Sequence, residues 1–405
     1  MRTIRAFLFF GFLGACLAGH AANHVVTANN SIQAAINAAS TGDNLIIWQG
    51  VYDEDLVISG KALTLRPLND GEVQVRSVTA NNAGGVVRLS NIRVETDVNA
   101  TKSSLHLLKC YILGDVTVAD AVDDGNNDLQ AVILQTTIRE KLTCKAKRSW
   151  ICYNTIRHSY LEGDAEVTGN EFAGREGGGI GIDVNGTATH ALIRNNRIRG
   201  YKGTFGYDMT AKCIGIRVNG GAKADIVNNL IYDCYDFGSS GIETDCGMGI
   251  FVQSTTGAKI LGNAIWHCFT LGGNTRGNRL VYAPFANVIL KNNLLWRNYG
   301  HVHPALIDGG VVSYDSVTLP YNTDAPFDAD GHPDANFVGS NAGPTDARYN
   351  DHDGTRNDIG MYGGHSYLIN GRTTDKPIPL GVRADPIVVP AGGIITIQSI
   401  GGTPK

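Results

Sequence analysis

Hydrophobic and polar residues alternate in short runs along most of this 405-residue chain, which is the pattern of β-strands with one buried face. Near the start, residues 31–39 differ, because their apolar side chains recur at helical spacing behind Ser31, a good N-cap residue. Three short apolar runs follow, at 45–48, 55–58 and 62–65. We expect one short helix that covers the open end of a stack of strands, since exposed strand edges promote aggregation.

The middle of the chain repeats one strand–Asn-Asn–strand unit. Alternation of side chains along a strand directs Ile193 and Ile198, and their counterparts in the other copies, inward. The repeat predicts an all-β fold, a right-handed parallel β-helix with a short N-terminal capping helix, in which each copy belongs to one coil. The four clearest copies are 191–199 (ALIRNNRIR), 224–232 (ADIVNNLIY), 258–266 (AKILGNAIW) and 287–296 (NVILKNNLLW).

Asparagine suits the corners of such coils. It adopts left-handed backbone conformations more readily than most residues, and its side-chain amide can form hydrogen bonds up and down the stack. The second Asn of each copy stands at 196, 229, 263 or 293, so successive coils are 33, 34 and 30 residues long. A second type of strand alternates with the first, at 179–184, 213–218 and 248–252. Each coil carries roughly ten residues more than a minimal one, which we expect as a loop.

The first residues have the pattern of an export signal. A basic start is followed by an apolar run, 6–13, that is too short to span a bilayer. Two processing sites compete: residues 13–16 (LGAC) resemble a lipobox, which would attach a lipid to Cys16, and residues 19–21 (GHA) resemble an ordinary cleavage site. We expect an exported protein, either extracellular, periplasmic or anchored to the outer membrane, without a membrane span.

Net charge and cysteine content limit the kinds of partner and of covalent link that we expect. The formal net charge is −4 and there is no basic stripe, which excludes nucleic acid as the expected partner. Export permits disulfides among the eight cysteines. Cys234 could pair with Cys268 of the next coil or with Cys246, and Cys144 could pair with Cys152. No cysteine has the spacing to histidine of a zinc site.

The opening and the repeats together resemble the pectate-lyase-like right-handed β-helix superfamily. Residues 32–65 are similar to the start of many exported bacterial β-helix proteins, and residues 350–364 (NDHDGTRNDIGMYGG) resemble a closing motif of such proteins. The resemblance covers roughly residues 27–364 and implies the fold, but no single activity, because the superfamily includes lyases, hydrolases, epimerases and non-catalytic surface proteins. The Asp-Pro-His-Glu motif of mannuronan epimerases is absent, and so is the Asn-Thr-Asp plus Gly-His-Gly set of polygalacturonases, since Asn-Thr-Asp occurs at 322–324 but Gly-His-Gly does not occur.

Three loops, 200–212, 235–247 and 269–286, follow the same strand in successive coils, so we expect them to wall one groove. A polysaccharide lyase on this fold needs a cation that neutralises a uronate carboxylate and a basic residue that takes the neighbouring proton. The basic candidates are Lys202, Lys212, Arg276 and Arg279. The candidate Ca²⁺ ligands are Asp208, Asp236, Glu243 and Asp245, of which the last three are also catalytic candidates. Glu243 with Asp245 as a hydrolytic pair, or solvated charges without a role, are the alternatives.

An aromatic column is expected outside the coils. Tyr232, Trp266 and Trp296 each follow an inward residue, and neighbouring coils lie about 4.8 Å apart. An exposed ladder of rings, with Tyr207 of the first loop, would bind sugar rings. The alternative is burial of the ladder under the C-terminal segment. The next column holds Asp233, His267 and Arg297.

Two acidic loops, 328–334 and 351–358, follow the coils, and both contain Asp-x-Asp-Gly. Their carboxylates could converge on a structural Ca²⁺ ion or form turns. The carboxylates concerned are Asp328, Asp330, Asp351 and Asp353.

Four parts of the chain are expected from these patterns: a signal at 1–21, the β-helix at 22–310, a C-terminal coil or cap at 311–366 and an extension at 367–405. The sequence thus predicts an exported carbohydrate-active or carbohydrate-binding β-helix protein whose partner is a polysaccharide or cell-surface glycan. A Ca²⁺-dependent lyase acting on uronate-containing glycans is preferred over a glycoside hydrolase. The alternative is a non-catalytic surface or glycan-binding scaffold.

Overall fold

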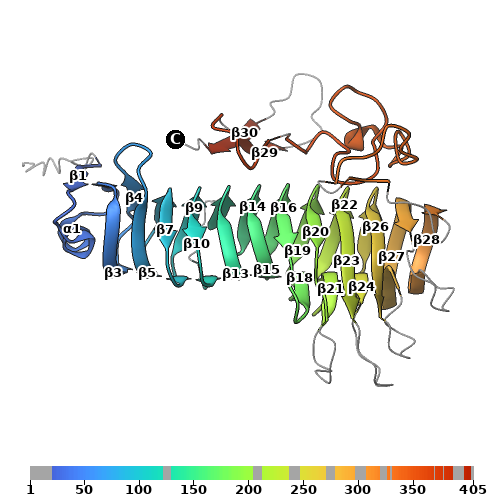
Figure 1. The fold of residues 1–405 in the computed structure, drawn as a ribbon, viewed down its shortest axis with the longest axis horizontal. Helices are drawn as coiled ribbons and strands as arrows, with labels where there is room; N and C mark the ends of the chain where they lie inside the picture. Colours follow the sequence, from blue (N-terminus) through green and yellow to red (C-terminus); the bar gives the residue numbers. More distant parts are fainter. Residues whose placement is uncertain are drawn as a thin grey trace, which may run out of the picture.

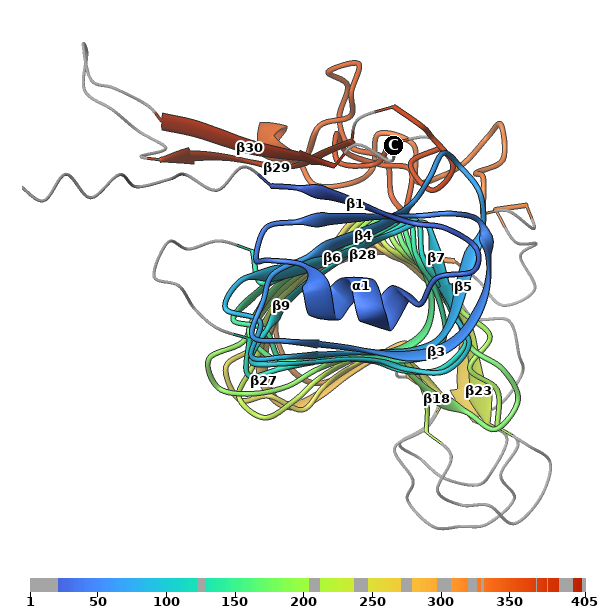
Figure 2. The same ribbon diagram turned by 90° about the vertical axis from the view of Figure 1, so that its left-hand side faces the viewer.

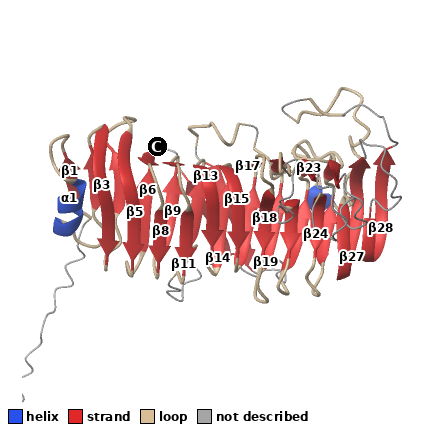
Figure 3. Ribbon diagram, turned by 60° about the horizontal axis from the view of Figure 1, so that its bottom comes forward, coloured by secondary structure: helices blue, strands red, loops and turns tan. Residues whose placement is uncertain are grey.

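The protein is a right-handed parallel β-helix, in which strands β1 to β28 form one continuous parallel sheet wound into coils (Figure 1). Figure 3 shows the strands stacked along the whole length of the solenoid. The computed structural model describes residues 21–121, 129–203, 212–236, 247–270, 279–296, 307–319, 326–328, 331–368, 370–376, 378–385 and 396–402. No helix among the described residues is long and apolar enough to cross a membrane.

The coils present three faces, which we call A, B and C. Within one coil the chain runs along face A up to the asparagine corner, and then along face B and face C. Face A stacks β1 (Asn23–Val26), β2 (Asn44–Ile47), β4 (Thr64–Pro67), β6 (Val86–Ser90), β9 (Ser104–Leu108), β12 (Ala131–Leu134), β14 (Arg148–Cys152), β16 (Asp164–Thr168), β19 (His190–Arg194), β22 (Lys223–Val227) and β25 (Ala258–Leu261).

Face B follows the asparagine corner, and face C follows face B. Face B stacks β7 (Ile92–Val94), β10 (Tyr111–Ile112), β17 (Glu171–Ala173), β20 (Arg197–Arg199), β23 (Leu230–Asp236) and β26 (Ala264–Thr270). Face C stacks β8 (Val98–Thr101), β11 (Val116–Ala119), β18 (Gly179–Val184), β21 (Cys213–Val218) and β24 (Met248–Val252). Four strands bend from face B into face C: β3 (Gly50–Ser59), β5 (Val73–Asn81), β13 (Thr137–Cys144) and β15 (Thr155–Leu161). The last two strands, β27 (Val281–Trp296) and β28 (Ile307–Leu319), pair with each other along their length.

The predicted capping helix is α1 (Ile32–Ala38), which lies across the N-terminal opening of the coils (Figure 2). Ser31 is its N-cap and accepts a hydrogen bond at Oγ from the Ala34 N–H at 3.1 Å. Ile32 and Ile36 are buried in the same core as the first strands. The helix therefore covers the open end, as predicted.

The core fills the inside of the coils with the residues that alternation predicts. Ile193 and Ile198 are fully buried, as are their counterparts Ile226, Ile231 and Ile260. Burial of such a continuous apolar column is the main force that stabilises a solenoid, because each coil alone has too little core.

The two asparagines of each pair have different roles. The second Asn points inward: Asn196 Nδ2 donates to Asn229 Oδ1 at 2.9 Å, and the ladder continues from Asn229 to Asn263 at 2.9 Å. The predicted hydrogen bonds along the stack are thus confirmed. The first Asn adopts the left-handed conformation, with φ of 55° at Asn195 and 54° at Asn228. Its side chain points outward.

The described C-terminal part of the chain continues the stack and then runs along the outside of the coils. Strand β28 continues the stack to Leu319, beyond the predicted end at residue 310. The described residues between 326 and 376, which we call the strap, fold back along the outside of the coils (Figure 1). The strap contains one 3₁₀ turn, η1 (Ala347–Tyr349), and is followed by an antiparallel pair, β29 (Ile378–Asp385) and β30 (Thr396–Gly402).

The strap docks on the left-handed corner residues. Asn228 Nδ2 donates to Asp358 O at 2.7 Å, Asn195 Nδ2 to Gly363 O at 2.7 Å, and Gln135 Nε2 to Gly371 O at 2.7 Å. Tyr153 and Lys109 occupy the same corner position in other coils and also have positive φ. Lys109 forms an ion pair with Asp375. The strap therefore crosses the coils from the C-terminal end towards the N-terminal end.

The structure has no disulfide between Cys144 and Cys152 or between Cys234 and Cys268, the two predicted pairs whose cysteines are both described. Cys144 points into the central core, whereas Cys152 belongs to a separate apolar cluster outside the coil, so the wall of the coil separates them. Cys234 and Cys268 are neighbours in register, as predicted from the stacking, but both remain reduced. Cys16 and Cys246 lie outside the described residues.

Candidate functional site

The described ends of the three long loops line up at the corner between faces B and C. Lys202 pairs with Tyr235 of the next coil, and Tyr235 pairs with Phe269 of the coil after that. This order follows from the parallel stacking of β20, β23 and β26, each of which leads into a loop. The predicted alignment of the loops is confirmed at this edge.

Aromatic and charged side chains gather at this edge, in what we call the corner cluster: Lys202, Asp233, Tyr235, Asp236, His267 and Phe269. Tyr235 stacks on Phe269 with ring centroids 5.1 Å apart and an interplanar angle of 11°. The Lys202 Nζ lies 5.3 Å from the centroid of the Tyr235 ring. Both rings and the lysine are half-buried. A cation above a partly exposed aromatic stack is a surface that can hold a ring-shaped anion.

Two carboxylates, those of Asp233 and Asp236, belong to the same strand as Tyr235. Asp233 forms an ion pair with Nδ1 of His267, whose ring lies 4.9 Å from that of Phe269. Asp236 approaches the chain at Gly203 so closely that a Cβ there would lie 1.9 Å from its Oδ1. Gly203 also donates its N–H to Tyr235 O at 2.8 Å. The chain that leads from Lys202 into the first loop is therefore held against the carboxylate of Asp236.

The remaining basic candidates lie where the loops return to face C. Lys212 is exposed, and its carbonyl accepts the Gly179 N–H. The Arg279 guanidinium lies 4.6 Å from the centroid of the Tyr282 ring. Lys202 and Asp236 thus belong to neighbouring coils at the same edge, while Lys212 and Arg279 stand just before the face C strands β21 and β27. The predicted residues outside the described part of the chain are Tyr207, Asp208, Glu243, Asp245, Arg276 and Arg297.

The aromatic column exists but is not an exposed ladder. Tyr232 stacks on Trp266 at 4.5 Å, and Trp266 lies 5.8 Å from Trp296. Trp266 is only 8% exposed and Trp296 only 1%. Phe327 of the strap stacks on Trp266 at 5.2 Å, and an apolar cluster of strap residues completes the cover. The expected exposed ladder is therefore not formed at Trp266 and Trp296, because the strap uses them as its own core, as the alternative of burial under the C-terminal segment predicted. Tyr232 is half-buried, and sugar binding by this column stays a prediction.

The acidic loops bind their own backbone. Asp353 Oδ1 accepts the Thr355 N–H at 2.9 Å, and Asp328 Oδ1 accepts the His332 N–H at 2.8 Å. Asp351 accepts the N–H groups of Gly364 and Asp358. Burial raises the pKa of Asp351 above its ordinary value, and the carboxylates of Asp358 and Asp353 add to this effect.

These contacts fit the turn-forming alternative for the acidic loops, while calcium at Asp328, Asp330, Asp351 and Asp353 stays a prediction. Asp330 lies outside the described residues. In the part of the chain that the structure describes, no three His, Cys, Asp or Glu side chains gather in a way that could hold a metal ion.

A cavity of about 240 Å³ lies between the strap and the coils, on the other edge of face B. The coils contribute Tyr153 and Arg197, and the strap contributes the other side chains. The sequence could not place this cavity, since it forms only when residues near 370 fold back onto a corner near 153. The residues from the strap are His332, Tyr362, Tyr367, Asn370, Gly371, Arg372 and Thr373.

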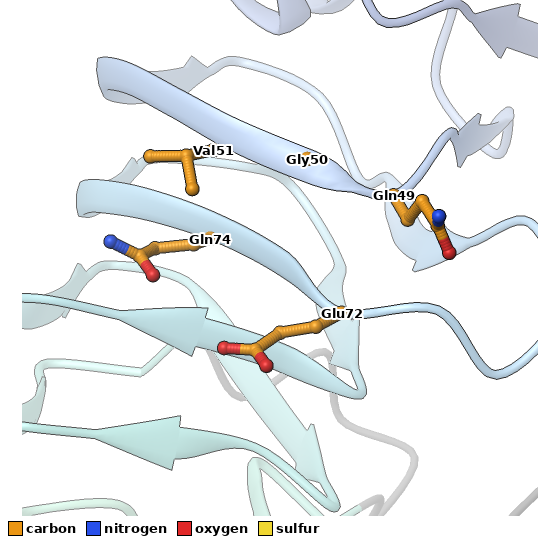
Figure 4. Close-up of a pocket in the computed structure, with 5 residues that line it drawn as sticks. All are labelled: Gln49, Gly50, Val51, Glu72 and Gln74. Carbon is orange, nitrogen blue, oxygen red and sulfur yellow. The ribbon is translucent and has the colours of Figure 1, made fainter.

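A groove near the N-terminal end of the coils is less suited to a ligand. It runs over β3 and β5 and is lined by Gln49, Val51, Glu72 and Gln74 (Figure 4). Figure 4 shows that the Gln49 and Glu72 side chains point in different directions. Without polar groups that converge on one point, this groove provides no basis for specific recognition.

Comparison with known proteins supports the fold. Residues 158–323 match the family model described as a right handed beta helix region. No curated protein matches the sequence. Among solved structures, the chain is similar to the crystal structure of pectate lyase Pel9A, with 13% sequence identity, a TM-score of 0.34, and coverage of 85% of this chain and 96% of that chain. Similarity at this level does not identify an activity.

Proposed function

We propose that this protein is exported and acts on a uronate-containing polysaccharide at the corner cluster, as a polysaccharide lyase. The observation that supports this most directly is the Lys202 amino group above the Tyr235–Phe269 stack, at the edge where the long loops begin. The rings offer apolar faces to the CH faces of a sugar, and Lys202 would act on that sugar as the base in its uncharged amine form.

The chemistry requires a base next to a bound uronate. The base removes the proton from the carbon that bears the carboxylate, and that electron pair forms a carbon–carbon double bond as the glycosidic C–O bond breaks. The leaving oxygen takes up a proton and becomes a hydroxyl group. In this proposal Lys202 is the base, since its amine lies at the edge of the cluster. A calcium ion held by Asp236 with Glu243 and Asp245 would neutralise the uronate carboxylate.

The activity can be tested with polygalacturonate, alginate and glycosaminoglycans in the presence of Ca²⁺, by following the ultraviolet absorbance of unsaturated chain ends. We expect Lys202→Ala to lower the rate at least about 100-fold, the usual contribution of a general base. Lys223→Ala is the matched control, because Lys223 is exposed on face A, away from the corner. Absence of unsaturated products from all of these polymers would exclude the lyase proposal for them.

A glycan-binding scaffold is the second candidate. It is favoured by the ion pair of His267 with Asp233, which engages one acid and one base of the cluster with each other. In this case the polymer binds without cleavage and Lys202→Ala changes affinity only. Phe269→Ala would then weaken binding in affinity electrophoresis, whereas chelation of Ca²⁺ would have no effect on it.

A further inference from the structure

We propose that the cavity beneath the strap is a second binding site, which takes a single carboxylate-bearing sugar, either free or at the end of a chain. It is lined by Tyr153 and Arg197 of the coils and by Tyr362, Tyr367 and Arg372 of the strap. The cavity lies at the corner between faces A and B, across face B from the corner cluster. The inference does not depend on lyase activity at that cluster.

The size and the lining of the cavity favour one sugar ring. At about 240 Å³ it is smaller than the usual 300–1,000 Å³ of sites for drug-sized ligands, so it suits a single ring rather than a length of polymer. Tyr362 stacks on His332 with centroids 5.0 Å apart, and Tyr367 meets Tyr362 edge-on at 5.1 Å. Aromatic faces beside polar groups match the alternating CH and OH surfaces of a sugar.

The charges favour an anion. Three guanidinium groups surround the buried carboxylate of Glu171: Arg372 Nη1 lies 3.0 Å and Arg199 Nε 2.7 Å from its oxygens, and Arg197 forms a third ion pair. Arg372 and Arg199 thus share one carboxylate, which cannot neutralise both. Asp328, a described acid near the cavity, is paired with His332 at 3.1 Å. A planar carboxylate fits the fork of an arginine better than a neutral hydroxyl group does.

Hydrogen bonds hold the strap in place around the cavity. The Tyr153 hydroxyl donates to Ser366 O at 3.3 Å and accepts the Leu368 N–H at 3.1 Å. Gln135 Nε2 donates to Gly371 O at 2.7 Å and to Thr374 O at 2.8 Å. These bonds fix the strap on both sides of the cavity, so a ligand orders few groups when it binds. Burial raises the pKa of Tyr362 to about 12, so its hydroxyl remains a donor at neutral pH.

Isothermal titration of the whole protein with galacturonate, glucuronate, galactose and inorganic phosphate tests this site. We expect both uronates to bind and galactose to bind at least about ten-fold more weakly, since it lacks the charged hydrogen bonds. Arg372→Gln should weaken uronate binding by a similar factor. Arg348→Gln on the same strap should not, because Arg348 is exposed and pairs with Asp346.

Several results would overturn the inference: no uronate binding, equal affinity for galactose, or unchanged affinity in Arg372→Gln. Phosphate that binds as tightly as the uronates would indicate a bare-anion site instead. If limited proteolysis shows that Arg372→Gln releases the strap, Tyr362→Leu provides the test, with the same expected loss. This site is judged by the loss of monosaccharide binding in Arg372→Gln and the lyase proposal by the loss of unsaturated products in Lys202→Ala, so failure of the one and failure of the other are distinguishable.

Discussion

At the scale of single residues, Glu171 is the most connected charge in the described part of the chain. Its side chain is 6% exposed and joins face B to the strap through Arg372. Burial by itself raises the pKa of Glu171, but the hydrogen bonds and charges of Arg197 and Arg199 outweigh it and hold the pKa below the ordinary value of 4.5. A carboxylate with a lowered pKa stabilises the folded state above its unfolded pKa, and this stabilisation is lost as the pH falls through the folded value.

Attachment of the strap should therefore weaken in acid. We expect proteolytic cleavage between residues 326 and 376, measured with an acid-active protease, to rise only once the pH falls below the ordinary glutamate value of 4.5. Cleavage that rises already near neutral pH, or that stays constant down to strong acid, would contradict the role of Glu171.

Replacement of the carboxylate tests the same contact at neutral pH. Glu171→Gln leaves three arginines without their counter-charge, and we expect the free energy of unfolding to fall by about 3 kcal/mol. Glu95→Gln is the control, because the Arg93 and Glu95 side chains keep 36% and 31% of their surface exposed, far more than Glu171, and their pair should contribute under about 1 kcal/mol. Chemical denaturation of the two variants measures the difference, and equal losses would refute the role given to Glu171.

At the scale of elements, the asparagine ladder explains how a corner with few apolar atoms stays buried. Asn229 Nδ2 donates to Ile193 O at 2.9 Å and to Asn263 Oδ1 at 2.9 Å, and its Oδ1 accepts the Asn196 N–H at 3.0 Å. One side chain thus forms hydrogen bonds with main-chain groups of a neighbouring coil and with the next asparagine of the ladder. The sequence predicted this ladder, because its signal is local and periodic.

Removal of one rung should be costly. Asn229→Ala leaves the Ile193 carbonyl and the Asn196 N–H buried without this partner, and we expect a loss of about 3 kcal/mol in denaturant unfolding. Asn44→Ala is the matched control, since Asn44 Nδ2 bonds only the side chain of Asn23, at 3.1 Å, on the surface. Its expected cost is under about 1 kcal/mol. A similar loss in both variants would show that a ladder asparagine contributes no more to stability than a surface asparagine does.

At the scale of the whole molecule, features that depend on the strap could not be predicted from the sequence, whereas features of the coils could. The contact of Asn195 with Met361 spans 166 residues and that of Lys109 with Asp375 spans 266, and neither leaves a periodic signal in the sequence. The coils, the capping helix and the edge that carries Lys202 could be predicted, because each depends on residues close in sequence or one coil apart. The burial of Trp296 and the cavity at Arg197 could not.

Loss of the corner contacts should free the strap without unfolding the coils. We expect the double substitution Gln135→Ala with Asn195→Ala to increase proteolytic cleavage between residues 326 and 376 several-fold, while far-ultraviolet circular dichroism stays unchanged. The double control Asn82→Ala with Asn91→Ala removes two other left-handed asparagines, with φ of 48° and 51°, from corners nearer the N-terminus. If the control is cleaved equally, backbone strain rather than lost strap contacts explains the effect.

The path of the strap has a consequence for the order of events in synthesis. A chain that emerges from its N-terminus can wind its coils one after another, and the strap arrives last. When it docks, it ties the coil of Asn228 to the coils of Gln135 and Lys109, which were made much earlier. If the coils between Lys109 and Asn228 unwind from either end, contacts of the strap near the middle of this region must then break as well. The finished molecule should therefore unfold more slowly than a nascent chain that has the same coils, because the strap, the last segment to be made, connects coils that are far apart in the stack.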